Sequence, residues 1–161
     1  RVVGVVGGGE SALTGAIYLS KFAKKVYLIH RRDQFRADRS NQDKIFSADN
    51  IEVIPNVLVK RIKGEKKLEG IVITDKNTNQ ETALKLDALF IYVGNIPNTD
   101  FVKGLINLDE EDYIITDENL MTNIPKIFAA GDVRKKVLRQ ITTAVGDGAL
   151  AAIMVQKYLS Q

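Results

Sequence analysis

The residues of this chain that could carry chemistry begin with a glycine-rich turn near its first residue. The turn reads Gly7-Gly8-Gly9-Glu10-Ser11-Ala12 and follows an apolar stretch at residues 2–6. Glycines allow a backbone to approach a pyrophosphate closely, and the next helix would offer unpaired N–H groups and its positive dipole end. A tight strand-to-helix turn without a ligand is the alternative, because this spacing is a weak motif alone. With a strand before it and a helix after it, the turn predicts a dinucleotide site.

A basic stretch at the end of the second predicted strand indicates which dinucleotide this would be. The stretch contains His30, Arg31, Arg32 and Arg36. No acidic residue stands where an NAD site places the Asp or Glu that accepts hydrogen bonds from the ribose. Guanidinium groups match a phosphate dianion instead, which favours NADPH, whereas a solvated surface loop is the alternative. We assign His30 to the nucleotide pocket rather than to acid–base catalysis.

The elements that must position these residues follow an α/β pattern. Apolar and polar periodicity predicts a Rossmann-like βαβαβ parallel sheet, followed by a three-stranded β-meander and one more buried strand. The predicted parallel strands and helices are 2–7, 11–22, 26–29, 37–48 and 51–54, the meander strands are 57–62, 68–74 and 81–86, and the returning strand is 88–93.

Glycine and proline mark a boundary after the returning strand, where we place a linker at Asn95–Thr99. Beyond it we expect a short helical piece at 100–104, strands at 113–116 and 127–130, and a closing helix at 139–159. A second Gly-x-Gly-x-x-Ala match, Gly146 to Ala151, has no strand before it. We therefore interpret Gly146 and Gly148 as helix glycines that permit close approach of a neighbour or ligand, not as a second dinucleotide turn.

Composition and charge limit the classes of function. Hydrophobic residues at 45%, charged residues at 27% and a net charge of +3 are ordinary for a soluble α/β protein. The basic stretch 60–67 has no interleaved aromatic residues, so it predicts a charged hairpin edge rather than a nucleic-acid site. No apolar run approaches a membrane span and no leader is evident, so we expect a cytoplasmic location. With no cysteine in the chain, dithiol chemistry would need sulfurs from outside it.

Four segments in register give the chain a specific resemblance. It resembles the low-molecular-weight, bacterial-type thioredoxin reductases, and thus a partial FAD/NAD(P)-binding fold with two dinucleotide domains. The family's pattern is matched by the glycine turn, by the basic stretch, and by two later segments, Phe128-Ala129-Ala130-Gly131-Asp132-Val133 and Arg139-Gln140-Ile141-Thr142-Thr143-Ala144-Val145-Gly146-Asp147-Gly148. The chain departs from it at Thr14-Gly15, where the family carries adjacent acidic residues.

The resemblance implies roles for these residues and an activity. Residues 1–95 would be the later part of an NADPH-binding domain and 96–161 the C-terminal segment of an FAD-binding domain. The cofactor contacts implied are Gly7, Gly8, Gly9, Glu10, Ser11, His30, Arg31, Arg32 and Arg36 for NADPH, and Gly131, Asp132, Arg139, Gln140 and Ile141 for FAD. Asp132 would bind the ribityl chain, and Gln140 and Ile141 would lie at the flavin ring.

In that family hydride passes from NADPH to FAD, then to a Cys-x-x-Cys disulfide and to thioredoxin, in a homodimer. The glycine-rich FAD turn and the cysteine pair of the family lie upstream of the point that corresponds to Arg1. We therefore expect an enzyme of the thioredoxin-disulfide reductase class as part of a longer protein, with this chain alone inactive. A thioredoxin-reductase-like ferredoxin–NADP reductase and a non-catalytic NADPH-binding module remain the alternatives.

Overall fold

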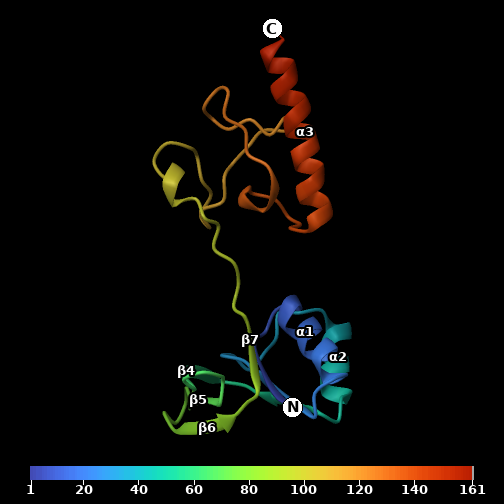
Figure 1. The fold of residues 1–161 in the computed structure, drawn as a ribbon, viewed down its shortest axis with the longest axis vertical. Coiled ribbons are helices and arrows are strands. Elements are labelled where there is room, and N and C mark those ends of the chain that lie inside the picture. Colours follow the sequence, from blue (N-terminus) through green and yellow to red (C-terminus); the bar gives the residue numbers. More distant parts are fainter. Residues whose placement is uncertain (161) are drawn as a thin grey trace. The chain divides into compact units, whose positions relative to one another are not determined.

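A computed structural model describes residues 1–160 of the chain (Figure 1). The chain divides into two compact units, unit 1 from Arg1 to Gly94 and unit 2 from Asn95 onward. Among the described residues, no helix combines the length and apolarity that a membrane span requires.

Unit 1 is built on a four-stranded parallel sheet with the strand order β3-β2-β1-β7. Continuous apolar stretches form these strands because both faces of the sheet are covered. The strands are β1 Val2–Gly7, β2 Lys25–Ile29, β3 Ile51–Ile54 and β7 Ala88–Tyr92, and the helices between them are α1 Glu10–Ser20 and α2 Arg39–Ser47. The predicted α/β fold with a βαβαβ parallel sheet is therefore confirmed.

Two apolar clusters cover the two faces of the parallel sheet. On one face, Leu13 and Ala16 of α1 and Ile45 of α2 pack with Val5 and Leu28 of the sheet. On the other face, the sheet meets the antiparallel meander through the cluster of Ile29, Val57, Ile71, Ile73 and Leu86. The sheet thus lies between a helical layer and the meander, and its strand ends are left free to form a site.

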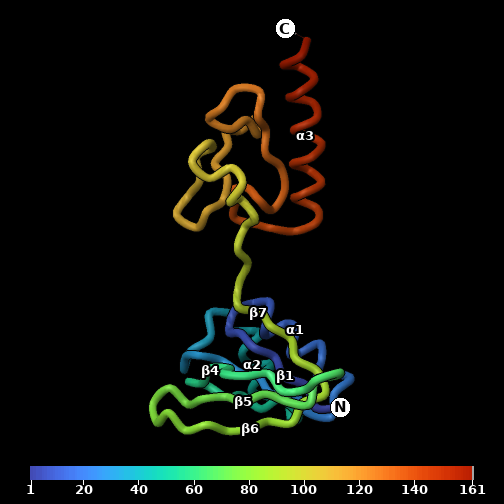
Figure 2. Tube along the Cα trace, turned by 60° about the vertical axis from the view of Figure 1, so that its left-hand side comes forward, coloured from blue at the N-terminus to red at the C-terminus, as the bar shows by residue number. Residues whose placement is uncertain are grey.

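The meander consists of β4 Val57–Lys63, β5 Gly70–Asp75 and β6 Glu81–Lys85, in the order β4-β5-β6. Figure 2 shows the three strands as neighbouring lengths of chain joined by two turns. The pairing of β4 with β5 shifts register between Val59 and Arg61. Such a bulge changes the direction in which side chains point, and this one lies at the basic residues Lys60 and Arg61 of β4.

Unit 2 has less regular structure than its sequence predicts. It contains the 3-10 turns η1 Asp100–Val102 and η2 Gly131–Val133, the helix α3 Ile141–Leu159, and a small core of Ile106, Ile114 and Ala129. The strands predicted at 113–116 and 127–130 are wrong, since these segments form only isolated bridges. An isolated bridge lacks the successive partners that make a ladder, so apolar runs here pack as loops.

The closing helix begins later than predicted, at Ile141 rather than residue 139. Gln140 has an extended backbone (φ −143°, ψ 160°) and forms a reciprocal capping box with Thr143. Similarly, α1 ends at Ser20 and α2 begins at Arg39, so both are shorter than their predicted ranges.

Candidate nucleotide-binding site

The glycines of the first turn face three different surroundings. At Gly7, which has a φ of 149°, a Cβ would lie 2.5 Å from the carbonyl oxygen of Tyr92. At Gly8 a Cβ would overlap the imidazole ring of His30. At Gly9 no atom of the described chain lies within 4 Å of that position. Gly9 is therefore the glycine whose open side lets a ligand approach the backbone.

The start of α1 offers donors without acceptors. Gly9 is the N-cap residue and supplies no side chain, and the N–H groups of Glu10 and Ser11 donate to no atom of the described residues. The Glu10 carboxylate is engaged elsewhere, because it accepts the Asp38 N–H at 3.0 Å and a hydrogen bond from the Asn41 side chain. Glu10 thus links α1 to the start of α2, and its N–H is the group that remains for an anion.

Three arginines follow β2 in a loop that we call the arginine loop, residues 31–36. Arg31, Arg32 and Arg36 are exposed, and among the described residues no carboxylate lies within 4 Å of their guanidinium nitrogens. The Arg36 N–H donates to the Gly8 carbonyl oxygen at 2.8 Å. This bond fixes the arginine loop against the glycine turn, so both parts of the predicted phosphate site form one structure.

His30 lies beneath this junction and is only 8% exposed. Its Nε2 is 3.2 Å from the Gln34 carbonyl oxygen, and its ring stacks on Phe35 with centroids 5.4 Å apart. Burial, and then the charges of the three loop arginines, lower the pKa of His30, although the bond to Gln34 opposes this. A neutral imidazole whose Nε2–H donates to Gln34 is the consistent state, which suits a residue that holds the loop in place.

A cavity of about 480 Å³ lies at the carboxyl ends of β1, β2 and β7. The predicted residues that line it are Gly7, Gly8, His30, Arg31 and Arg36, whereas Gly9, Glu10, Ser11 and Arg32 lie outside its lining. Apolar side chains form another wall, including Leu58 and Ile62 of β4, Ile91 of β7 and Val93 just after it. A concave site with apolar walls and a few convergent charges at strand ends is typical of nucleotide binding in α/β proteins.

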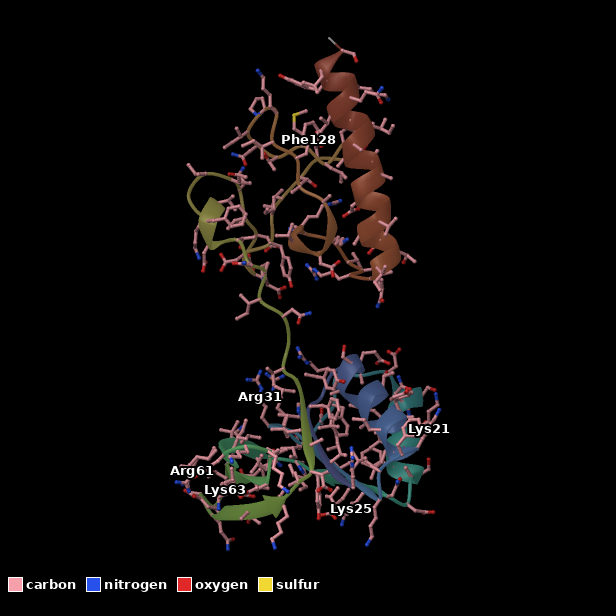
Figure 3. All side chains as sticks on the ribbon, viewed as in Figure 1. Lys21, Lys25, Arg31, Arg61, Lys63 and Phe128 are labelled. Carbon is pink, nitrogen blue, oxygen red and sulfur yellow. The ribbon has the colours of Figure 1, made fainter. Side chains whose placement is uncertain are left out.

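Two basic residues of the cavity wall are not predicted from the sequence as part of the site. Lys60 and Arg61 of β4 line the cavity, although their stretch predicts only a charged hairpin edge. Both are paired with Glu81 of β6, with 3.5 Å between Arg61 and the carboxylate. Figure 3 shows Arg31 and Arg61 on the same side of unit 1, away from Lys21 and Lys25. No local pattern reveals this neighbourhood, because it depends on how the meander packs on the sheet.

A second group of predicted residues gathers in unit 2 around the start of α3. Gly131 has a φ of 83°, and its N–H donates to Asp147 Oδ2 of α3 at 3.0 Å. The same carboxylate accepts from Lys136 at 3.1 Å and Arg134 at 3.3 Å. Burial opposes the charged form of Asp147, but these hydrogen bonds and charges outweigh it and lower its pKa. Asp147, which the sequence did not single out for a role, therefore fixes the Gly131 turn to the helix.

The remaining predicted residues of unit 2 lie on and beside this turn and helix. The Asp132 side chain is 60% exposed and free to accept from a ligand apart from Lys136 Nζ at 3.7 Å. The Arg139 guanidinium lies 3.6 Å from the centroid of the Tyr113 ring, and its buried Nε has no partner among the described residues. Gln140 caps α3, and Ile141, the first residue of the helix, is 83% exposed.

Gly146 and Gly148 are predicted to permit the close approach of a neighbour or a ligand, and the described part of the chain supplies no such neighbour. No atom of the described residues lies within 4 Å of a Cβ built at either position. Both glycines are exposed on α3. Glycine in a helix interior lowers stability by about 1 kcal/mol relative to alanine. The contacts of the described residues give no packing reason for this cost.

Known proteins share both the sequence and the fold of this chain. A thioredoxin reductase of Listeria monocytogenes is 46% identical over 158 residues, which is 98% of this chain and 50% of that protein. A protein of Clostridium pasteurianum, described as a 34.2 kDa protein in rubredoxin operon, is 45% identical over 155 residues, 96% of this chain and 50% of that protein. The crystal structure of Lactococcus lactis thioredoxin reductase matches with a TM-score of 0.82 at 44% identity, covering 99% of this chain and 53% of that one.

These matches confirm the resemblance to bacterial-type thioredoxin reductases. The chain spans about half the length of the curated relatives it matches. The family model described as pyridine nucleotide-disulphide oxidoreductase matches residues 1–148, which include both groups of site residues. This chain therefore belongs to the pyridine nucleotide-disulphide oxidoreductase family.

Proposed function

We propose that unit 1 binds NADPH, with the 2′-phosphate at the arginine loop and the pyrophosphate at Gly9 and the start of α1. One observation carries this proposal. Three arginines without a carboxylate partner within 4 Å belong to a loop whose backbone is hydrogen-bonded to the glycine turn, from the Arg36 N–H to the Gly8 carbonyl oxygen, at the carboxyl edge of a parallel sheet. Charge-assisted hydrogen bonds to a phosphate dianion would compensate these cations. The end of β2 also lacks the acidic residue that would favour NADH.

We further propose that unit 2 contributes contacts to FAD. The residues present fit such a ligand, because Arg139 Nε is buried without an acceptor and Asp132 presents an exposed carboxylate beside the Gly131 turn. Asp132 would accept hydrogen bonds from ribityl hydroxyls, and the first N–H groups of α3 would face the flavin ring. When bound, FAD would supply a two-electron carrier between a nicotinamide and a disulfide.

The reaction that fits both proposals is reduction of a thioredoxin-type disulfide by NADPH in a homodimeric, longer protein. The arginine loop and glycine turn would orient the nucleotide, and the cavity walls would exclude water around it. The sulfurs of the dithiol would come from outside this chain, since it contains no cysteine. Thioredoxin reductases among the relatives support this choice over other acceptors.

The test compares NADPH with NADH binding to the 161-residue chain by fluorescence titration. Replacing Arg31, Arg32 and Arg36 with Ala should remove the preference for NADPH, since each charge-assisted bond contributes roughly 1.5–3 kcal/mol. NADH affinity should change little. A matched variant with Lys66, Lys67 and Lys85 replaced by Ala loses the same charge from meander positions outside the cavity lining and should keep the preference.

Equal loss of affinity for both nucleotides in the arginine variant would contradict the phosphate role. Flavin absorbance after incubation with FAD and removal of free ligand separates the flavoenzyme from a module that only holds NADPH. Within the longer protein, turnover with thioredoxin rather than ferredoxin as acceptor would separate the disulfide reductase from the ferredoxin–NADP reductase alternative.

A further inference from the structure

The turn between β5 and β6 brings a lysine to the arginine loop from far along the chain. Lys76 Nζ donates to the Arg31 carbonyl oxygen at 3.1 Å. The Lys76 N–H donates in turn to the Asn56 carbonyl oxygen at 2.9 Å, at the junction of β3 and β4. The ammonium group is therefore held next to the peptide that carries Arg31 and Arg32.

The turn that presents Lys76 is internally fixed. Asp75 Oδ1 accepts the N–H groups of Asn77 and Thr78, each at 2.8 Å. The Asn79 N–H donates to the Asp75 carbonyl oxygen at 2.9 Å, and Asn79 has a φ of 58°, which asparagine tolerates better than most residues. Because these bonds order the turn before any ligand arrives, the lysine backbone needs no rearrangement to serve the site.

Basic residues outnumber acidic ones at this place, where the carboxylates are Asp33 of the arginine loop and Asp75 beside Lys76. No carboxylate of the described residues lies within 4 Å of Lys76 Nζ, and the same holds for the three arginines of the loop. By contrast, Lys60 and Arg61, also basic residues of the meander, share Glu81. Repulsion among four uncompensated cations opposes their gathering, whereas a dianion bound among them would favour it.

We propose that Lys76 is a specificity-determining cation of the 2′-phosphate subsite, supplied by the meander. It acts in two ways: its charge adds to the field of the arginine loop, and its bond to the Arg31 carbonyl oxygen holds the loop in place. This inference rests on the proposed NADPH function and extends it to a residue outside the arginine loop. The meander thereby becomes part of nucleotide selection.

The experiment measures NADPH and NADH dissociation constants of the 161-residue chain at low and at physiological salt. Lys76→Met should weaken NADPH binding about threefold to fivefold, the size expected for the loss of one exposed ion pair, and leave NADH binding unchanged. The loss should shrink at higher salt. Lys76→Arg should retain the preference, and Lys76→Gln, which keeps a donor but no charge, should resemble Lys76→Met.

Lys66→Met is the matched control, since it removes the same charge from the other meander turn, and Lys66, unlike Lys76, donates no hydrogen bond to the arginine loop in the described part of the chain. Thermal melting of each variant checks that the fold is intact, which the exposure of Lys76 leads us to expect. An NADPH affinity of Lys76→Met equal to that of Lys66→Met, or an equal loss for NADH, would overturn the inference.

The arginine variants keep this failure apart from failure of the proposed function. If they abolish the preference for NADPH while Lys76→Met does not alter it, only the role of Lys76 is wrong. If the unaltered chain shows no preference for NADPH, the proposed function itself fails, and the role of Lys76 fails with it.

Discussion

Replacement of Gly8 and Gly9 by alanine should have opposite consequences, although the two residues are neighbours in one motif. A Cβ at Gly8 overlaps the His30 ring, which is buried, stacked on Phe35 and hydrogen-bonded to Gln34. The ring has little freedom to move away, so Gly8→Ala should lower the free energy of unfolding by about 1–3 kcal/mol, the usual cost of overpacking. A Cβ at Gly9 meets nothing within 4 Å, and its φ of −100° suits alanine.

Gly9→Ala should therefore lower the free energy of unfolding by no more than about 1 kcal/mol, the cost of alanine in place of glycine at an N-cap. Its methyl group points instead into the space that we assign to the pyrophosphate, so affinity should fall for NADPH and NADH alike. Urea unfolding followed by circular dichroism measures the first quantity, and nucleotide titration measures the second.

A double-mutant cycle tests whether the His30 ring causes the effect at Gly8. In a His30→Ala background the overlap is gone, and Gly8→Ala should then cost little, which gives a coupling energy of about 1–3 kcal/mol. Effects of Gly8→Ala and His30→Ala that add to within about 0.5 kcal/mol would refute the reasoning, because they would show that the two residues do not compete for space.

Two further predictions concern titratable groups. Asp147→Asn should lower the free energy of unfolding by about 1.5–3 kcal/mol at pH 7, because the carboxylate accepts from Gly131, Lys136 and Arg134, whereas the exposed Glu118→Gln should change little. Because folding lowers the pKa of Asp147, this stabilisation is fully present above the unfolded pKa of about 3.9. It is lost as the pH falls from there through the folded pKa. Below the folded pKa, the urea midpoints of wild type and variant should converge. His30 is the single histidine, and burial lowers its pKa, so the unfolded chain takes up the proton first. The free energy of unfolding should decline as the pH falls below about 6.5, until the folded pKa of His30 is reached. His30→Gln should remove this part of the pH dependence. An equal pH dependence in wild type and variant would contradict a lowered pKa.

The parallel sheet could be predicted from the sequence because its strands carry their own signal. Continuous apolar residues such as Val26–Ile29 require burial on both faces, and the glycine turn between β1 and α1 confirms the connection. The same apolar signal misled at 113–116 and 127–130, because a strand also needs a partner ladder and the described chain supplies only single bridges there. Hydrophobicity indicates burial, and it does not specify with what a segment pairs.

Packing bears on one position at which the chain departs from the expected pattern. Gly15 stands where the resemblance leads us to expect an acidic residue, and the sequence alone offers no reason for the glycine. In the structure a Cβ at Gly15 would lie 3.0 Å from the Tyr92 ring, which is tighter than ordinary contact. The reason is thus a contact between α1 and the end of β7, two segments far apart in sequence.

The two basic segments of unit 1 differ in charge compensation, and only the structure reveals this difference. In the sequence, the basic stretch 60–67 and the arginine loop are both runs of charged residues. Only the glycine turn that precedes the loop favours it as a phosphate site. In the structure Lys60 and Arg61 share Glu81, whereas Arg31, Arg32, Arg36 and Lys76 have no carboxylate within 4 Å among the described residues. Pairing satisfies the first group within the chain. The second group has no such partner among the described residues, and two of its members, Arg31 and Arg36, line the cavity at the strand ends, which supports the proposed NADPH site.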